Sequence, residues 1–276
     1  MPICKAKMQY NYEKICKAIE AAAAETAGFI IREAAQFDAN RTEIKGFNDF
    51  VSYVDKGSEK ALVEKLSAIL PEAGFITEEG SSAKKGEKYC FVIDPLDGTT
   101  NFIHGLKFYA ISIALLEDNE PVVGIVHVVG GNEVFTAWKN GGAWLNGKRI
   151  NVSATTKLSN SLVATGFPYY DFARLDNYMQ LLTWLCKNTR GIRRFGSASI
   201  DIAYVACGRF DVFFEYGLHP WDVAAGVIIL REAGGRISDF SGNEKNLSGA
   251  EIIATNSDIY PEFLKITDRF MNKQKN

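Results

Sequence analysis

The chain has 276 residues, of which 47% are hydrophobic and 23% are charged, so it has the composition of a globular protein with ample material for a core. This length suits one large domain or two intimately packed lobes. The net charge of −2 argues against a nucleic-acid partner. The apolar runs are too short to span a bilayer, and the N-terminus lacks the apolar segment of a signal peptide.

The cysteines are scattered and form no CxxC pair; they are Cys4, Cys16, Cys90, Cys186 and Cys207. Because their number is odd and several lie inside apolar runs, we expect reduced core thiols rather than a disulfide framework. This usage predicts a cytoplasmic protein.

The first predicted element is a long helix over residues 10–37, where apolar side chains recur at helical spacing. Residues 50–54 alternate in polarity and could form a short strand or an extended entry. A second helical pattern follows Asp55 and ends before Pro71. By local sequence alone, Asp55 is best interpreted as the N-cap of that helix.

Residues 75–79 predict a short strand that ends in two acids, Glu78 and Glu79. Neighbouring strand residues point to opposite faces, so only one of the two can join a given site. The alternative is a solvated acidic turn.

The next apolar run, residues 89–93, predicts a buried strand that ends on Asp94, with a second carboxylate at Asp97. Gly98 permits a tight turn, and residues 99–101 have side chains suited to a helix N-cap. Two carboxylates so close together are costly unless a cation lies between them, and a helix start favours anions. This stretch therefore predicts a metal ion beside a phosphate.

The remainder mixes strands and helices. Turn signals between apolar runs predict an antiparallel meander after residue 109, and helical patterns follow at residues 171–187, 199–207, 220–232 and 260–271. Asp222 lies in the first turn of one of these helices, where a simple interaction with the helix dipole competes with a functional role. A junction near residues 147–156 predicts an N-terminal lobe over 1–150 and a C-terminal lobe over 151–276.

The candidate acids offer only oxygen ligands, which favours Mg²⁺ over Zn²⁺. His104, His127 and His219 lack metal-ligand spacing, so structural roles are favoured for them. The sequence contains no P-loop, no dinucleotide fingerprint and no serine nucleophile elbow, which disfavours kinases, dehydrogenases and serine hydrolases.

Residues 94–102, Asp-Pro-Leu-Asp-Gly-Thr-Thr-Asn-Phe, resemble the signature of the inositol monophosphatase family of Mg²⁺-dependent, lithium-sensitive sugar phosphatases. Residues 221–226 resemble the second signature of that family, and residues 75–79 resemble the acidic element before the first. The resemblance covers nearly the whole chain. It implies an α+β fold with alternating α-β-α-β-α layers, mixed and antiparallel sheets, two lobes with the site between them, and a homodimer.

The resemblance also implies two to three Mg²⁺ ions. Glu78, Asp94 and the carbonyl of Leu96 would hold the first ion. Asp94, Asp97 and Asp222 would hold the second, so that Asp94 bridges the two. A third, weaker ion would depend on Glu78 and waters.

Further roles follow from the same resemblance. Asp55 would pair with Thr99 to orient the attacking water, although Ser52 stands where threonine is more usual. The predicted catalytic residues are Thr99, Asp55 and Glu78, and the predicted substrate-binding residues are Asp97, Gly98, Thr99, Ala198, Glu215 and Asp222.

The substrate is inferred from the segment between Glu215 and Asp222, which looks most like the inositol monophosphatase branch. The nucleotidase branch tends to place a lysine near Ala198, and this chain has none there. We expect hydrolysis of inositol-1-phosphate by a metal-activated water. The alternatives are a phosphatase of fructose 1,6-bisphosphate, histidinol phosphate or adenosine 3′,5′-bisphosphate, and a weakly catalytic, metal-binding regulatory or RNA-associated module.

Overall fold

The computed structural model describes residues 10–36, 42–46, 49–245 and 248–272. The helices in these ranges are α1 (Tyr12–Ala34), α2 (Tyr53–Ile69), α3 (Thr99–Ile103), α4 (Leu175–Asn188), α5 (Ala198–Ala206), α6 (Pro220–Glu232) and α7 (Tyr260–Met271). The strands are β1 (Thr42–Gly46), β2 (Asp49–Ser52), β3 (Gly74–Thr77), β4 (Tyr89–Asp97), β5 (Ala110–Glu117), β6 (Glu120–Val128), β7 (Glu133–Trp138), β8 (Gly142–Leu145), β9 (Lys148–Ile150), β10 (Leu162–Thr165), β11 (Gly191–Arg193), β12 (Val212–Tyr216), β13 (Gly235–Ser238) and β14 (Glu251–Asn256).

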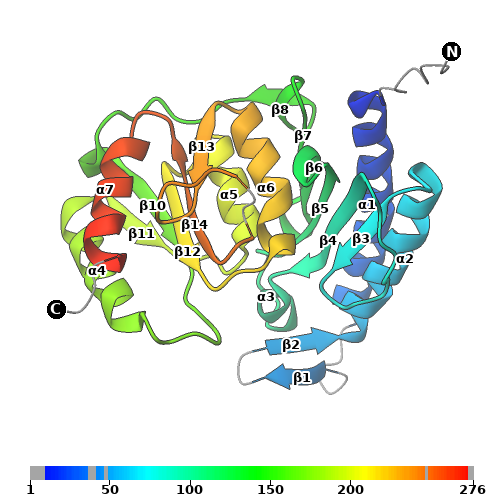
Figure 1. Ribbon diagram of the computed structural model, residues 1–276. Helices are drawn as coiled ribbons and strands as arrows, with labels where there is room; N and C mark the ends of the chain where they lie inside the picture. Colours follow the sequence, from blue (N-terminus) through cyan, green and yellow to red (C-terminus); the bar gives the residue numbers. More distant parts are fainter. Residues whose placement is uncertain (1–9, 37–41, 47–48, 246–247, 273–276) are drawn as a thin grey trace, which may run out of the picture.

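These elements stack as five layers, which confirms the expected α-β-α-β-α arrangement (Figure 1). Helices α1 and α2 cover the outer face of a seven-stranded sheet, α5 and α6 fill the middle, and α4 and α7 cover the outer face of a five-stranded sheet. The first sheet has the order β3-β4-β5-β6-β7-β8-β9 and is antiparallel except for β3 and β4. The second has the order β11-β10-β12-β14-β13 and is mixed.

Strand β5 shows why the layers pack closely. Its larger residues, Ile111, Ile113 and Leu115, join the core under α1 and α2. Its small residues, Ala110 and Ala114, face the central core that contains α5 and α6. From Ala110 to Leu115, period-two alternation thus places large side chains on one face and small ones on the other, so α6 can approach the sheet; Leu116, near the strand end, is a large residue on the central face. A third core lies between the second sheet and α4 and α7.

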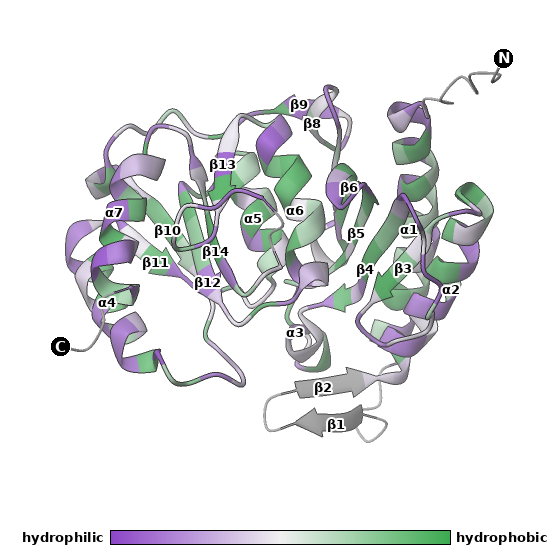
Figure 2. Cartoon of the chain, viewed as in Figure 1, coloured by the Kyte–Doolittle hydropathy of each residue, from purple (hydrophilic) through white to green (hydrophobic). Residues whose placement is uncertain are grey.

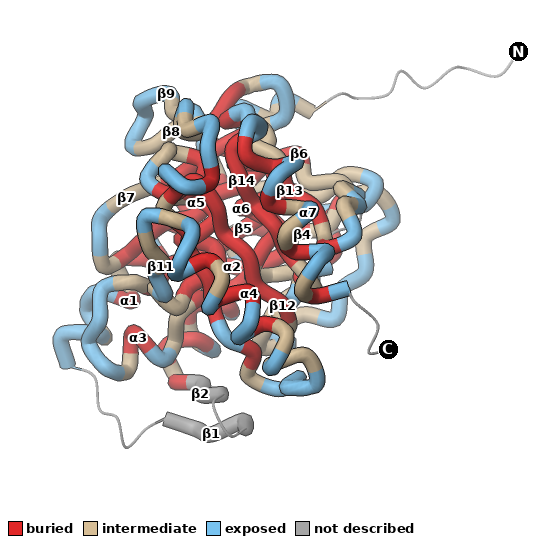
Figure 3. The backbone as a smooth tube through the Cα atoms, turned by 90° about the vertical axis from the view of Figure 1, so that its left-hand side faces the viewer, coloured by how far each residue is buried: buried red, intermediate tan, exposed pale blue. Residues whose placement is uncertain are grey.

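Hydropathy and burial agree with this layering. Apolar residues concentrate on the strands and on α5 and α6 (Figure 2), and the buried backbone runs through the same elements (Figure 3). Within the described ranges, the helices are all too short or too polar to serve as membrane spans.

The predicted starts of α4 and α3 were wrong. The helix predicted over residues 171–187 begins only at Leu175, because the Asp171 side chain accepts the backbone N–H of Ala173 at 2.9 Å and holds residues 171–174 in a turn. None of residues 99–101 is an N-cap: Gly98 occupies that position at the start of α3, with φ of 90° and no side-chain cap. A Cβ at Gly98 would lie 2.7 Å from the carbonyl oxygen of Phe108, so glycine is required there.

The cysteines are free where the structure describes them, but not all belong to the core. Cys16 is buried and Cys90 and Cys207 are half-buried, whereas Cys186 is exposed on α4, so that part of the prediction was wrong. Cys4 lies outside the described residues. The lobe boundary at residue 150 stays a prediction, although the first sheet ends at Ile150 and the second begins at Leu162.

Candidate active site

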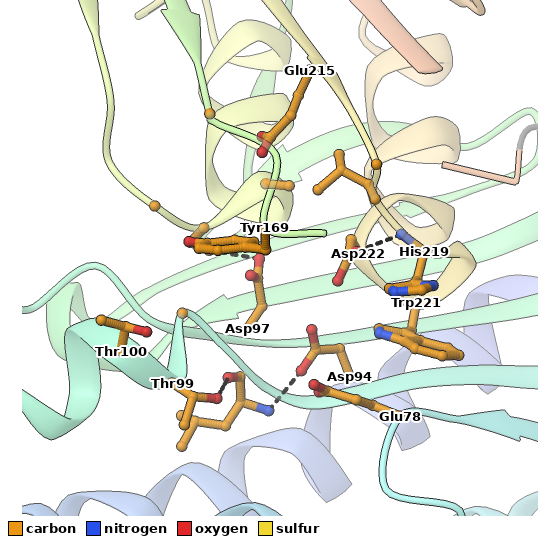
Figure 4. A pocket seen from close by; sticks show the side chains of 18 of the residues that line it. Glu78, Asp94, Asp97, Thr99, Thr100, Tyr169, Glu215, His219, Trp221 and Asp222 are labelled. Carbon is orange, nitrogen blue, oxygen red and sulfur yellow. Dashed lines mark hydrogen bonds between the residues drawn. The ribbon is translucent and has the colours of Figure 1, made fainter. Parts of the chain in front are cut away.

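A cavity of about 300 Å³ opens between the two sheets (Figure 4). Its walls come from the end of β4, the start of α3, the loop after β10, the residues before α5, the end of β12 and the start of α6. The lining residues include every predicted metal ligand, Glu78, Asp94, Leu96, Asp97 and Asp222, together with Gly98, Thr99, Ala198 and Glu215. Asp55 is the one predicted site residue that does not line the cavity. It lies behind Thr99.

The carboxylates converge at one end of this cavity. One oxygen each from Asp94, Asp97 and Asp222 lies within 4.8 Å of the other two. The charges of Glu78, Asp97 and Asp222 all act on the carboxyl group of Asp94, which lies among them (Figure 4). Asp94 is therefore at the centre of the cluster. Glu79 is not among the residues that line the cavity, so one acid of that pair joins the site, as the strand geometry predicts.

A β-bulge explains how β4 presents both of its acids. Asp94 pairs with Ser112 and Asp97 pairs with Ala110, so β4 uses three steps where β5 uses two. On a regular strand, residues three apart would point to opposite faces. The extra residue in the bulge brings both carboxylates to the same side. The backbone N–H of Leu96 also donates to Asp94 Oδ1 at 2.9 Å, which fixes that carboxylate inside the bulge.

The charges of the buried carboxylates favour a bound cation. Burial raises the pKa of Asp94 well above its ordinary range, and the charges of Glu78 and Asp97 raise it further. Burial and neighbouring carboxylates likewise raise the pKa of Glu78 and that of Asp222. Like charges held this close favour protonation or a bound cation, and a cation reverses the direction of the pKa shifts. The buried, oxygen-only donor set fits a hard divalent ion such as Mg²⁺.

Asp97 is held from the opposite lobe. Its Oδ2 accepts the hydroxyls of Ser197 and Ser199 at 2.6 and 2.5 Å and the backbone N–H of Ser199 at 2.8 Å. These donors lie at the start of α5, where free N–H groups and the helix dipole favour a carboxylate. Burial raises the pKa of Asp97, and these hydrogen bonds oppose that change. Sequence reasoning missed both serines, since nothing local connects them to a residue about one hundred positions earlier.

Asp55 is not the N-cap of α2, which corrects the local interpretation. Ser52 is the cap: its hydroxyl accepts the Val54 N–H at 3.1 Å, and Asp55 Oδ2 accepts the Ser52 N–H at 2.8 Å. This reciprocal capping box leaves Asp55 Oδ1 to accept the Thr99 hydroxyl at 2.8 Å. The Thr99 Oγ1 also lies 3.0 Å from the Leu96 carbonyl oxygen. Asp49 belongs to the same stretch, which resembles a family element that ends at Asp55, but its side chain lies outside the described residues.

Asp222 has both of the roles considered for it from the sequence, because it interacts with the start of a helix and also faces the acidic cluster. It is in the first turn of α6, where its Oδ2 accepts the backbone N–H of His219 at 2.6 Å. That bond uses one oxygen and leaves the other to face Asp94 (Figure 4). His219 stacks on Trp221 at the edge of the cavity, with ring centroids 4.7 Å apart.

The far side of the cavity carries different chemistry. The Glu215 carboxylate lies directly over Gly166, where a Cβ would come within 2.0 Å of Oε1. Burial raises the pKa of Glu215 to about 8, the nearby Arg194 opposes this, and Asp97 adds to it. Arg194 donates to the Tyr169 hydroxyl at 2.6 Å and also lines the cavity. This wall presents both acceptors and donors to a ligand. Gly166, Tyr169 and Arg194 were not among the predicted site residues.

Comparison with known proteins gives a consistent result. The sequence model described as the inositol monophosphatase family matches residues 11–271. A Neisseria meningitidis serogroup B protein named putative Nus factor SuhB is 46% identical over 246 residues, covering 88% of this chain and 94% of that protein. Inositol-1-monophosphatase of Mesorhizobium japonicum is 36% identical over 245 residues, covering 88% and 92%.

Solved structures agree on the fold. The extragenic suppressor protein suhB from Bartonella henselae superposes with a TM-score of 0.87 at 35% identity, covering 93% of this chain and 99% of that one. A Thermotoga maritima IMPase superposes with a TM-score of 0.84 at 34% identity, covering 94% and 98%.

Proposed function

Because the chain belongs to the inositol monophosphatase family, we propose that it is a Mg²⁺-dependent phosphomonoesterase that hydrolyses inositol-1-phosphate to inositol and phosphate. The observation that carries this proposal is the meeting of Asp94, Asp97 and Asp222 within 4.8 Å at one end of a cavity whose other end holds Glu215. One end suits a cation and a phosphate, and the other suits a polyol.

The assignment of ligands to each ion comes from the family resemblance, and the contacts in the cavity support it. Glu78, Asp94 and the carbonyl of Leu96 would hold one ion, while Asp94, Asp97 and Asp222 would hold a second, with a third, weaker ion near Glu78. The central position of Asp94 supports its assignment as the bridging ligand. Bound Mg²⁺ would supply charge neutralisation for the phosphate and leaving oxygen and would make a water easier to deprotonate.

Thr99 and Asp55 would orient that water. The Thr99 hydroxyl has one proton, and its shortest contact, at 2.8 Å, is with Asp55 Oδ1. When Thr99 donates that proton in its hydrogen bond to Asp55, a lone pair on Thr99 Oγ1 can accept a hydrogen bond from the water. This hydrogen bond would orient the water oxygen toward phosphorus. Glu78, the third predicted catalytic residue, would also interact with this water. The Ser52 donors hold Asp55 in place, so the pair is pre-organised.

The remaining contacts would fix the substrate. Backbone N–H groups of Gly98 and Thr99 would face the phosphate. The Ala198 N–H and the Glu215 carboxylate would contact inositol hydroxyls, and the free oxygens of Asp97 and Asp222 lie close enough to the cavity to assist. Glu215 suits this role because hydroxyl donors can satisfy a buried acceptor. A homodimer and lithium sensitivity remain predictions from the family resemblance, and a cytoplasmic location remains a prediction from the cysteine usage.

A second candidate function is a Nus-factor role, in which the chain is a regulatory or RNA-associated module that needs little catalysis. The observation that favours it is the naming of the relatives: those called Nus factor or putative Nus factor SuhB are 41–46% identical to this chain, while two called inositol-1-monophosphatase are 36% and 38% identical. The absence of a nucleic-acid partner therefore stays a prediction.

A phosphate-release assay separates the two candidates. The purified chain would be tested with and without Mg²⁺ on inositol-1-phosphate, fructose 1,6-bisphosphate, histidinol phosphate and adenosine 3′,5′-bisphosphate. We expect Mg²⁺-dependent release that is fastest on inositol-1-phosphate. Faster release from another ester would correct the substrate, and no release from any ester would favour the regulatory role.

A further inference from the structure

Helix α2 carries a second buried acid that the proposed mechanism does not use. Glu59 lies one turn after Asp55 on the same face of the helix and is fully buried, with 0% of its surface exposed. A buried carboxylate is costly unless hydrogen bonds compensate for its lost hydration. The partners of Glu59 therefore indicate what it does.

Both oxygens of Glu59 accept backbone N–H groups from one turn. Oε2 accepts the N–H of Glu79 and Oε1 accepts the N–H of Ser81, each at 2.7 Å. These lengths are typical of hydrogen bonds to a charged acceptor, which are stronger than neutral ones. Between the two donors, Gly80 has φ of +71°, which turns the chain so that both N–H groups reach the same carboxylate.

That turn follows directly on Glu78. The Glu78 backbone N–H donates to the Ile93 carbonyl oxygen at 3.3 Å, which ties this residue to β4. The next N–H groups along the chain are tied to Glu59. The backbone of Glu78 is thus fixed on both sides, and its side chain points into the cavity toward Asp94 (Figure 4).

We propose that Glu59 is a positioning residue that fixes the turn at residues 78–81 and thereby holds the Glu78 carboxylate in the cation pocket. This inference rests on the proposed function, because it assigns Glu78 to a cation. One face of α2 then organises two parts of the site: Asp55 orients Thr99, and Glu59 orients Glu78. Because α2 is a single rigid element, the two parts keep a fixed relative position.

The test is calorimetric titration of the full chain with MgCl₂ or MnCl₂ alone, which requires no turnover. Residues that orient a metal ligand typically change metal affinity by about 10- to 100-fold, so we expect Glu59→Gln to weaken the tightest ion by that factor. The matched control is Glu64→Gln, an exposed position on the same helix, which should leave affinity unchanged. Unchanged cation affinity in folded Glu59→Gln protein would overturn the proposal.

A double-mutant cycle distinguishes positioning from a general loss of stability. If Glu59 acts through Glu78, then Glu59→Gln should have no further effect on cation affinity in a Glu78→Gln background. Additive losses would contradict the proposal. Should Glu59→Gln fail to fold, Gly80→Val strains the same turn from its exposed side, where a Cβ meets nothing within 4 Å. It should also weaken cation binding, and normal affinity would count against the proposal.

The same titration separates this inference from the proposed function. A wild-type chain that binds Mg²⁺ and loses affinity on Glu59→Gln, yet releases no phosphate from any ester, would retain the positioning role and refute the phosphatase. A wild-type chain that binds neither Mg²⁺ nor Mn²⁺ would refute both.

Discussion

Replacing Glu215 by glutamine keeps the shape of this buried side chain and removes its ability to ionise. Burial raises the pKa of Glu215 from an ordinary 4.5 to about 8. Between these two values the folded chain keeps a proton that the unfolded chain has lost. The contribution of Glu215 to the free energy of unfolding is therefore greatest at low pH. It falls by about 1.4 kcal/mol per pH unit as the pH rises toward 8. From pH 5 to pH 8 this amounts to roughly 4 kcal/mol.

The assay is denaturant unfolding of the wild type and of Glu215→Gln at several pH values, with a chelator present. The other carboxylates of the cavity contribute to both proteins, so the difference between the two curves isolates Glu215. We expect equal stability near pH 5 and an advantage for the variant that grows to roughly 4 kcal/mol by pH 8. Glu64→Gln, which changes an exposed residue, should follow the wild type. Parallel curves for Glu215→Gln and wild type would show that Glu215 is ionised at no cost and refute the reasoning.

Three further substitutions test individual contacts. Ser199→Ala removes one of the hydroxyls that hold Asp97 and should lower the free energy of unfolding by about 1.5–3 kcal/mol in denaturant titration; an unchanged midpoint would show that this bond contributes nothing. Gly166→Ala places a Cβ within 2.0 Å of Glu215 Oε1 and should lower kcat/KM about 100-fold, whereas wild-type kinetics would mean that Glu215 is not a substrate contact. Thr99→Val removes the hydroxyl proposed to orient water and should lower kcat by about 100-fold or more with little change in KM; an effect confined to KM would reassign it to substrate binding.

Local patterns located many of the helices and strands, whereas the layered arrangement was expected from the family resemblance. Helical spacing located α1, and alternation with turn signals located the meander that became β5 to β9. Boundaries failed where a side chain competed with the backbone. Asp171 formed a turn instead of starting α4, and Ser52 displaced Asp55 as the cap of α2. The start of each helix depends on which nearby side chain accepts a free backbone N–H group, and local composition does not determine this.

The acids of the site were candidates from the sequence because each lies near the end of a strand or the start of a helix, but the family resemblance was needed to combine them into one site. The residues that hold them in place were not predictable. Ser199 reaches Asp97 from the other lobe, and Glu59 reaches the turn after β3 through backbone groups that have no residue signature. The bulge that brings Asp94 and Asp97 to one side depends on register with β5, which a single strand does not reveal.

In the proposed mechanism, Asp94 bridges the cations that drive phosphate release. The most direct test measures phosphate release from inositol-1-phosphate against Mg²⁺ concentration for wild type and for Asp94→Asn, with circular dichroism to verify folding. We expect Mg²⁺-dependent turnover in the wild type and none in the folded variant at any Mg²⁺ concentration. Near-normal turnover by Asp94→Asn would contradict it.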